Sequence, residues 1–320
     1  MKHVRDLTPG TGLSALISFL KEEKYEFVAP TPATHNRNNQ RRGNERARTL
    51  MDAFGWSRPF LWTLLPKPLF ELLKDSDIIF ECDAGWKSSV RGSTLDGHLF
   101  LHSAFPTVSA DAVFFGPDTY RFARAIKHNL LFEPRQINRA LDLGCGSGAG
   151  GVIIAKNALC RELVLTDIND AALKMSRLNA AAAGLSNVTT VRSDLFANVH
   201  GEFDMIVANP PYLNDPLQRA YRHGGGELGS GLSIRIAQAA KDRLAPGGTL
   251  LLYTGSPIVC GVDRLLQTIE HDFADCDMRW SYEEIDPDVF GEELETTAYS
   301  TVDRIAAVVL IARKPGVLAC

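Results

Sequence analysis

The sequence has few cysteines, no long hydrophobic run and no excess of positive charge. Its six cysteines are scattered over 320 residues, with no Cys-x-x-Cys pair and no histidine at metal-ligand spacing, so neither a disulfide scaffold nor a zinc site is expected. The longest late apolar run, 305–312, falls far short of the roughly 20 residues that cross a bilayer. The net charge of -4 provides no global attraction for nucleic acid, although it leaves room for a local basic patch. We therefore expect a cytoplasmic protein with reduced thiols, no metal and no membrane contact.

The composition is that of a chain with a sizeable packed core. Hydrophobic residues make up 45%, charged residues 22% and aromatic residues 8% of the sequence. These proportions exclude a disordered or collagen-like chain. A length of 320 residues predicts two domains, or one large α/β domain with an added part. We expect a first domain over 1–110 and a second over 111–320.

The second domain shows a regular alternation of strand and helix patterns. Runs rich in leucine and β-branched residues predict strands at 140–145, 162–167, 188–194, 203–211, 248–255, 278–285 and 303–313. Apolar residues at helical spacing lie between most of these runs. Such alternation is typical of a mostly parallel sheet covered by helices on both faces.

The first domain, 1–110, is expected to be a small α+β unit that recognises the substrate. Helical patterns lie at 11–23 and, interrupted by two prolines, within 57–74. The runs 77–83 and 98–105 are predicted to be strands around a glycine-containing hairpin.

One segment of this domain is rich in arginine. Residues 31–50 hold a single acid, Glu45, and five arginines: Arg37, Arg41, Arg42, Arg46 and Arg48. One interpretation is a solvated polar loop that leads into a helix. The other is a phosphate- or acid-binding patch, because planar guanidinium groups bind such anions bidentately.

A glycine-rich turn follows the first predicted strand of the second domain. It comprises Asp142, Gly144, Gly146 and Gly148 and precedes a helix. Glycine lets the backbone approach a ligand closely, and a helix N-terminus offers unpaired N–H groups. A tight turn without a ligand is the alternative interpretation.

Acidic residues end the next two predicted strands. Asp167 can accept hydrogen bonds from both hydroxyls of a ribose, and Asp194, followed by Leu195, stands where a side chain meets an adenine edge. Each aspartate alone is compatible with a turn or a helix N-cap. In this order, at successive carboxyl ends of parallel strands, they predict one nucleotide-binding crevice.

The fourth predicted strand ends in Asn209-Pro210-Pro211-Tyr212, the most specific motif in the sequence. Two prolines fix a rigid, extended loop. The loop places the Asn209 side-chain oxygen beside the Pro210 carbonyl oxygen, so the pair can accept both hydrogens of a planar NH₂ group. Tyr212 offers an aromatic face for a flat amide or base.

Together these motifs resemble a known family. Residues 140–211 are similar to the class I S-adenosylmethionine-dependent methyltransferases that carry an NPPY motif and a methyltransferase small domain. Within them, 164–213 is particularly similar to the HemK-like glutamine methyltransferases of translation termination factors, and it also resembles amino-methyltransferases of guanine and adenine. The similarity covers about 110–312. It implies a Rossmann-like, seven-stranded α/β sheet, mostly parallel with an antiparallel last strand, beside a smaller N-terminal α+β domain.

The resemblance also implies a cofactor and its contacts. S-adenosyl-L-methionine would bind with its methionine part along the glycine turn, its ribose at Asp167 and its adenine at Asp194 and Leu195. The acceptor nitrogen would lie at the catalytic residues Asn209, Pro210, Pro211 and Tyr212, and Asn209 would also border the cofactor. Upstream, 113–126 resembles the family segment that closes over the cofactor, with Pro117, Asp118 and Thr119 at the matching positions.

The implied activity is methyl transfer to a planar nitrogen, with the side-chain amide of a protein glutamine as the first hypothesis. The sequence departs from the HemK-like pattern after the motif, where 223–235 replaces the usual Glu-Pro pair and glycine-rich stretch. The alternative acceptor is an adenine or guanine amino group in RNA or DNA, with the arginines of 31–50 on phosphates. Opposing that alternative is an acidic loop predicted at the ligand end of the sheet, formed by Asp286, Asp288, Glu292, Glu293 and Glu295. A non-enzymatic binding module is disfavoured by the intact motif.

Overall fold

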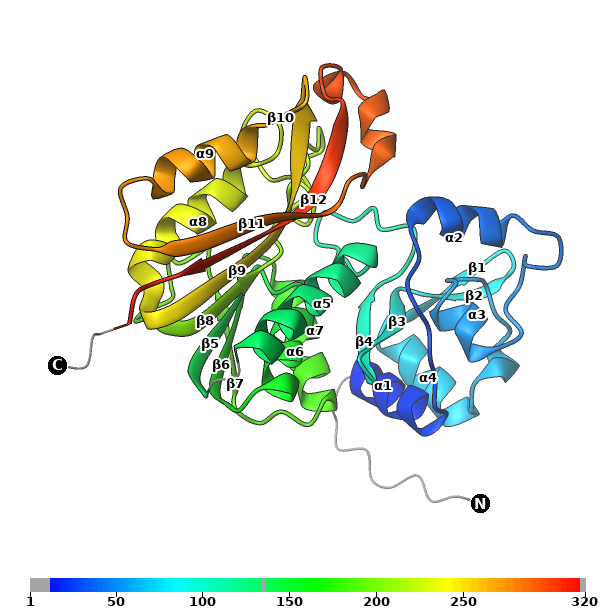
Figure 1. Ribbon diagram of the computed structural model, residues 1–320. Helices are drawn as coiled ribbons and strands as arrows, with labels where there is room; N and C mark the ends of the chain where they lie inside the picture. The colour runs from blue at the N-terminus through cyan, green and yellow to red at the C-terminus, as the bar shows by residue number, and fades with distance from the viewer. Residues whose placement is uncertain (1–11, 134–135, 317–320) are drawn as a thin grey trace.

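The computed structural model describes residues 12–133 and 136–316. A large sheet with helices on both faces lies beside a smaller N-terminal unit (Figure 1). Among the described residues, no helix is long and apolar enough to cross a membrane.

The N-terminal unit combines short helices with two separate hairpins. Its helices are α1 (Gly12–Glu22), α2 (Pro32–Asn39), α3 (Leu50–Phe54), η1 (Trp62–Leu64) and α4 (Lys67–Asp75). Its hairpins are β1 (Ile79–Cys82) with β2 (Gly85–Ser88), and β3 (Val90–Leu95) with β4 (His98–Ser103). The predicted α+β character is confirmed.

One detail of the prediction for this unit is wrong, and another is confirmed only in part. The runs 77–83 and 98–105 belong to different hairpins, since β1 pairs with β2 and β4 pairs with β3. The predicted helices within 57–74 are separated at Pro66, since η1 ends before it and α4 begins after it, but Pro68 lies inside α4. Pro66 is the N-cap residue of α4, where a missing N–H costs nothing, and residues 57–61 are not helical.

The second part is a seven-stranded sheet in the order β11-β12-β9-β8-β5-β6-β7. Its strands are β5 (Ile137–Leu143), β6 (Cys160–Asp167), β7 (Val188–Arg192), β8 (Phe203–Ala208), β9 (Leu244–Val259), β11 (Arg279–Asp286) and β12 (Arg304–Arg313), and a two-residue β10 (Val262–Asp263) pairs with β9. The last strand, β12, is antiparallel to both of its neighbours, and the pairs among β5 to β9 are parallel. This confirms the predicted fold class.

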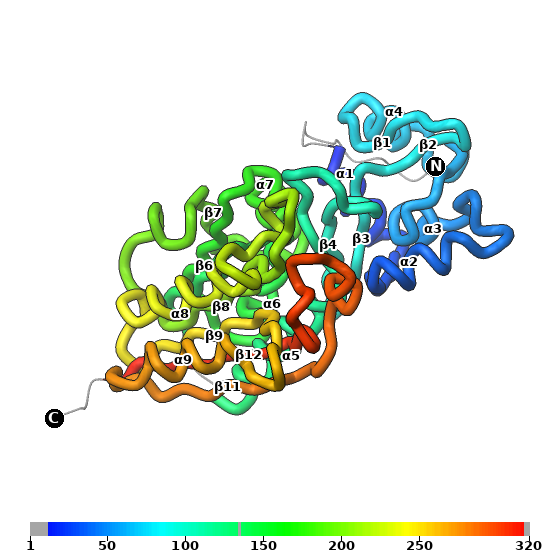
Figure 2. The backbone as a smooth tube through the Cα atoms, turned by 90° about the horizontal axis from the view of Figure 1, so that it is seen from above, coloured from blue at the N-terminus to red at the C-terminus, as the bar shows by residue number. Residues whose placement is uncertain are grey.

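Helices cover both faces of this sheet (Figures 1 and 2). They are α5 (Pro117–Phe132), α6 (Ala149–Asn157), α7 (Asp170–Ala182), α8 (Gly231–Arg243) and α9 (Arg264–Phe273), with the short turns η2 (Gly291–Glu295) and η3 (Thr297–Tyr299) between β11 and β12. Apolar residues of α5, α6 and α7 belong to one buried cluster, and those of α8 and α9 belong to another. The two clusters lie on opposite faces because alternate residues of a strand point to opposite sides.

The N-terminal unit packs on the α7 side of the sheet. Its buried apolar residues form one continuous cluster with those of α5 to α7. The buried Asn179 of α7 joins the two parts: its Oδ1 accepts the Leu101 N–H at 2.9 Å, and its Nδ2 donates to the Leu101 and Ser147 carbonyls, both at 2.9 Å. The glycine turn that contains Ser147 is therefore braced by a residue that also holds β4. A domain boundary at 110 stays a prediction.

Candidate functional site

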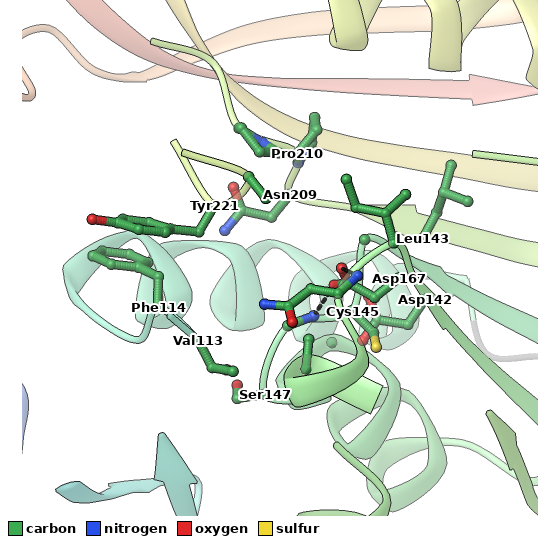
Figure 3. A pocket seen from close by; sticks show the side chains of 18 of the residues that line it. Val113, Phe114, Asp142, Leu143, Cys145, Ser147, Asp167, Asn209, Pro210 and Tyr221 are labelled. Atoms are coloured by element: carbon green, nitrogen blue, oxygen red, sulfur yellow. Dashed lines mark hydrogen bonds between the residues drawn. The ribbon is translucent and has the colours of Figure 1, made fainter. Parts of the chain in front are cut away.

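A crevice opens at the carboxyl ends of β5, β6, β7 and β8 (Figure 3). Open α/β sheets bind ligands at this edge, where neighbouring connections leave the sheet on opposite faces. The predicted residues that line it are Asp142, Gly144, Gly146, Asp167, Asp194, Leu195, Asn209, Pro210 and Pro211. The fold thus brings together motifs that follow four different strands of the sheet.

The turn after β5 presents bare backbone to the crevice. Gly144 and Gly146 have φ values of +69° and +51°, in the left-handed region that favours glycine. A Cβ added to either residue meets no atom within 4 Å. A ligand can therefore lie directly on the main chain here. Gly148 instead packs behind the turn, where an added Cβ would lie 2.9 Å from the Ser176 Cβ.

Two carboxyl groups support this turn, the buried one of Asp142 and the half-buried one of Asp167. The Asp142 Oδ2 accepts the Gly151 N–H of α6 at 2.7 Å, and burial raises the pKa of the Asp142 carboxyl to about 7. The Asp167 carboxylate accepts the Gly146 N–H at 3.0 Å and the Asn169 N–H at 2.9 Å. Burial also raises the pKa of Asp167, and the two backbone donors oppose that shift. Asp167 therefore both shapes the turn and borders the crevice.

The residues after β7 form the outer wall of the crevice. Asp194 is exposed, and its Oδ1 lies 3.9 Å from an Arg235 guanidinium nitrogen. Leu195 follows with a φ of +47°, which is uncommon for a branched residue, in a turn where the Ala197 N–H donates to the Asp194 carbonyl at 3.0 Å. This wall combines an apolar side chain with a solvated acid.

The loop after β8 carries two hydrogen-bond acceptors without a donor. No described residue forms a hydrogen bond with the Asn209 side chain or donates one to the Pro210 carbonyl. Asn209, Pro210 and Pro211 line both the crevice and a smaller adjoining pocket. A group that fills the pocket can therefore meet these acceptors while it faces the crevice.

Tyr212 is buried, so its ring is not a freely exposed stacking surface. Its ring is buried against Tyr253 and Phe290, at centroid distances of 6.5 and 5.8 Å, and borders the adjoining pocket. A Cβ at Gly255 would lie 2.3 Å from the ring, so glycine is required there. Tyr212 thus anchors the loop, and its stacking role stays a prediction.

Several pocket residues were not predicted as site residues. Phe114 and Tyr221 line both the crevice and the pocket, with rings nearly parallel at 5° and centroids 6.4 Å apart, beside Asn209 (Figure 3). The Tyr221 hydroxyl donates to the Thr107 carbonyl at 2.7 Å, which ties the segment after the motif to the segment before α5. No local pattern marks this pair, because its members are more than 100 residues apart.

Asp118 lies at the floor of the pocket and is buried. It accepts a hydrogen bond from the Tyr253 hydroxyl at 2.6 Å and from an Arg121 Nη1 at 3.2 Å. Burial raises the pKa of the Asp118 carboxyl. Only its place in the 117–119 match gave a signal for it in the sequence.

The acidic loop between β11 and β12 is less charged than its composition suggests. The Asp286 carboxylate lies 2.7 Å from an Arg121 guanidinium nitrogen, and Glu293 is buried in an ion pair with Arg222. The prediction that this loop lies at the ligand end of the sheet is confirmed, since β11 is parallel to β9. Its repulsion of phosphates is weakened by these two pairs.

The glycine-rich segment after the motif is packed tightly beneath the acceptor loop. The Gly224 N–H donates to the Leu213 carbonyl at 2.8 Å, and the Gly224 carbonyl accepts the Leu232 N–H at 2.7 Å. A Cβ on Gly224 would lie 1.9 Å from the Gly229 carbonyl oxygen and 2.6 Å from that of Pro211. The segment therefore supports the loop that carries Asn209.

We expect Gly224→Ala to lower the free energy of unfolding by about 2 to 3 kcal/mol, since backbone must move to admit the methyl group. Urea unfolding followed by fluorescence measures this change. The control is Gly316→Ala, because a Cβ there meets no atom within 4 Å. Equal stability of the two variants would contradict the tight packing of Gly224.

Comparisons with known proteins match the part of the chain that forms most of this crevice. The family model "Methyltransferase small domain" matches residues 125–270. The chain carries a methyltransferase small domain. This is the small domain of S-adenosylmethionine-dependent methyltransferases, so the family resemblance in the sequence is confirmed.

The small domain is shared with relatives of different names. The release factor glutamine methyltransferase of Deinococcus radiodurans is 35% identical over 140 residues, which are 39% of this chain and 49% of that protein. The ribosomal RNA small subunit methyltransferase C of Actinobacillus pleuropneumoniae serotype 7 is 39% identical over 112 residues, 35% of this chain and 31% of that protein. Among solved structures, the M. jannaschii tRNA m1G37 methyltransferase aligns with 71% of this chain and 57% of that chain, at 15% identity and a TM-score of 0.48. The chain thus spans half or less of the length of these two curated relatives.

Proposed function

We propose that this protein is an S-adenosyl-L-methionine-dependent N-methyltransferase that acts on a planar nitrogen. The observation that carries the proposal is the pair of acceptors at Asn209 and Pro210, which have no donor among the described residues. They lie where the crevice joins the smaller pocket. A planar NH₂ group needs two acceptors in this arrangement, and one side of the group then faces the crevice.

The crevice residues fit the cofactor in their chemistry. The open side of Gly144 and Gly146 leaves room for a chain of atoms along the backbone. The Asp167 carboxylate, with its two lone-pair-bearing oxygens, suits the two hydroxyls of a ribose. Leu195 provides an apolar surface for an adenine, and Asp142 places a carboxyl group behind the glycine turn. S-adenosyl-L-methionine would supply an electrophilic methyl group, whose bond to the sulfonium sulfur breaks as its bond to the acceptor nitrogen forms.

The chain's own residues orient the acceptor and balance its charge. The lone pair of an amide or aryl amino nitrogen is delocalised, so the nitrogen is a weak nucleophile. Asn209 Oδ1 and the Pro210 carbonyl accept its two N–H groups, which directs the lone pair and stabilises the positive charge that develops on nitrogen. Pro210 and Pro211 keep both acceptors in place without rearrangement. The nitrogen then loses one proton, for which no dedicated base is required.

Two kinds of methyl acceptor are compatible with this chemistry. The side-chain amide of a protein glutamine is our first proposal, supported by relatives named as glutamine methyltransferases of release factors and of ribosomal protein uL3. The amino group of an RNA or DNA base is the second, favoured by the parallel rings of Phe114 and Tyr221 beside Asn209. Half-buried aromatic rings that line such a site suit stacking with a flat base.

Transfer of labelled methyl groups distinguishes the two methyl acceptors, a protein glutamine and a nucleic-acid base. We expect the protein, incubated with methyl-labelled cofactor and a cell extract, to label material that is then treated with nuclease or protease in parallel. Label that survives nuclease and is lost with protease supports the glutamine amide. Label that is lost only with nuclease rejects it in favour of a base.

A further inference from the structure

The arginine-rich segment forms an exposed surface without counter-ions. Its members lie on α2 and in the loop that leads to α3, and all are exposed: Arg37, Arg41, Arg42, Arg46 and Arg48. None of them forms an ion pair with an acid that the structure describes. We call this set the arginine surface. Its charge faces solvent, in a chain whose net charge is -4.

The nearby acids are committed to the backbone or to a buried arginine. Asp52 accepts hydrogen bonds from the Thr49 N–H at 3.1 Å and from the buried guanidinium of Arg58. Glu45 accepts the Gly43 N–H at 3.0 Å. Asp52 is thus taken up by Arg58, and the single charge of Glu45, which attracts Arg48, leaves the five guanidinium groups with a positive excess.

The same contacts hold the segment in a defined shape. The Arg58 Nε donates to Asn39 Oδ1 at 2.9 Å, and Asn44 Nδ2 donates to the Asn38 carbonyl at 2.8 Å. Thr49 and Asp52 form a reciprocal capping box at the start of α3. These bonds fix both ends of the loop. A preorganised set of guanidinium groups loses less entropy on binding than the same groups on a flexible loop.

Apolar side chains are exposed close to these arginines. The Ala47 N–H donates to the Pro59 carbonyl at 2.7 Å, which brings the loop alongside 59–62. In that stretch Leu61 is 47% and Trp62 51% exposed. The half-exposed Trp62, three residues after the Pro59 contact, adds an aromatic face for bases to the cations that bind phosphates.

We propose that the arginine surface and Trp62 bind a single strand of nucleic acid. Arginine pairs bidentately with phosphate, and the indole stacks on an unpaired base whatever its identity. An acidic protein would need a separate apolar or aromatic side chain to cover the indole, whereas each nucleotide of a strand carries both a phosphate and a base. This inference goes beyond the proposed function and is independent of which nitrogen is methylated.

The position of the surface indicates an extended partner. Figure 1 shows the loop after α2 on the side of the N-terminal unit that points away from the large sheet. A ligand that reaches both this loop and the crevice has to be a macromolecule. In this proposal the N-terminal unit holds the nucleic-acid strand, and the methyltransferase small domain lies beside that unit.

Fluorescence anisotropy of the full chain with short labelled single strands of RNA and of DNA tests this proposal. We expect binding that weakens with salt. Replacement of three arginines (Arg37→Gln, Arg41→Gln and Arg42→Gln) should lower the affinity more than tenfold and reduce the salt slope by about 2, because each phosphate contact on a single strand contributes about 0.7. Trp62→Ala should lower the affinity about tenfold with an unchanged slope.

The matched control removes three exposed arginines elsewhere: Arg124→Gln, Arg264→Gln and Arg279→Gln. Its net charge equals that of the first variant, so equal weakening by both would overturn the proposal. Absence of binding to both strands, or equally effective competition by poly-glutamate, would also overturn it. Calorimetry with S-adenosylmethionine on the same samples keeps the two proposals apart. If the chain binds strands but does not bind the cofactor, only the proposed function is overturned. If it binds the cofactor but does not bind strands, only this inference is overturned.

Discussion

Replacement of Asp167 by alanine is expected to lower the affinity for S-adenosylmethionine by at least about 100-fold, since each hydrogen bond to a charged group contributes about 1.5 to 3 kcal/mol. The carboxylate lies at the carboxyl end of β6 and borders the crevice. It also accepts the Gly146 and Asn169 N–H groups, so its loss frees the glycine turn as well as the ribose contact. Isothermal titration calorimetry with the cofactor and with its demethylated product measures both effects.

The matched control for this variant is Asp170→Ala. Asp170 stands three residues later, in the first turn of α7, with an exposed carboxylate 3.3 Å from an Arg192 guanidinium nitrogen. Both variants remove one carboxylate from the same connection, but only Asp167 faces the crevice. If the two bind the cofactor equally well, Asp167 has no ribose-binding role.

Replacement of Asn209 by alanine is expected to reduce methyl transfer about 100- to 1,000-fold, the effect of losing one preorganised hydrogen-bond partner in the transition state. The variant leaves the Asp167 and glycine-turn contacts intact, so its cofactor affinity should change far less than its turnover. The reduction should appear in kcat more than in KM, because the acceptor stabilises charge that develops during transfer.

Asn138→Ala is the control for this second variant. Asn138 is exposed at the amino end of β5, at the opposite edge of the sheet from the crevice. It should retain full turnover. A kcat of Asn209→Ala equal to that of Asn138→Ala would refute the proposal that the hydrogen-bond acceptors Asn209 and Pro210 stabilise the transition state, whatever the cofactor affinity.

The sequence was most informative where structure depends on local patterns. The strands and helices of the sheet follow from period-two and period-3.6 apolar spacing, and the glycine turn, Asp167 and Asn209 are all fixed to strand ends. Parallel strands place their carboxyl ends at one edge, so these residues meet without further information. The crevice could therefore be predicted before its walls were known.

The N-terminal hairpins were mispredicted because one strand lacks apolar alternation. The run Gly85–Ser88 is short and polar, and it pairs with β1 while Trp86 also bridges to Phe60. The turn between β3 and β4 carries a local sequence signal for a hairpin, an Asp-Gly pair. Asp96 and Gly97 have φ values of +52° and +76°, and an Asp-Gly pair is a strong indicator of a tight hairpin.

The walls of the acceptor pocket depend on contacts between distant segments. Phe114 comes from the segment before α5 and Tyr221 from the segment between β8 and α8, and the Tyr253 hydroxyl donates to Asp118 across 135 residues. Burial of Tyr212 follows from the absence of a side chain at Gly255, which no local pattern reveals. Such residues become visible only once the chain is folded.

The most direct test of the central claim is methyl transfer by the wild type and by Asn209→Ala at saturating labelled cofactor. The wild type should transfer label from S-adenosylmethionine to an acceptor nitrogen in a cell extract. The variant, shown by calorimetry to bind the cofactor, should transfer at most about one hundredth as much. Absence of transfer by the wild type, or equal transfer by the variant, would contradict an N-methyltransferase that holds its acceptor between Asn209 and Pro210.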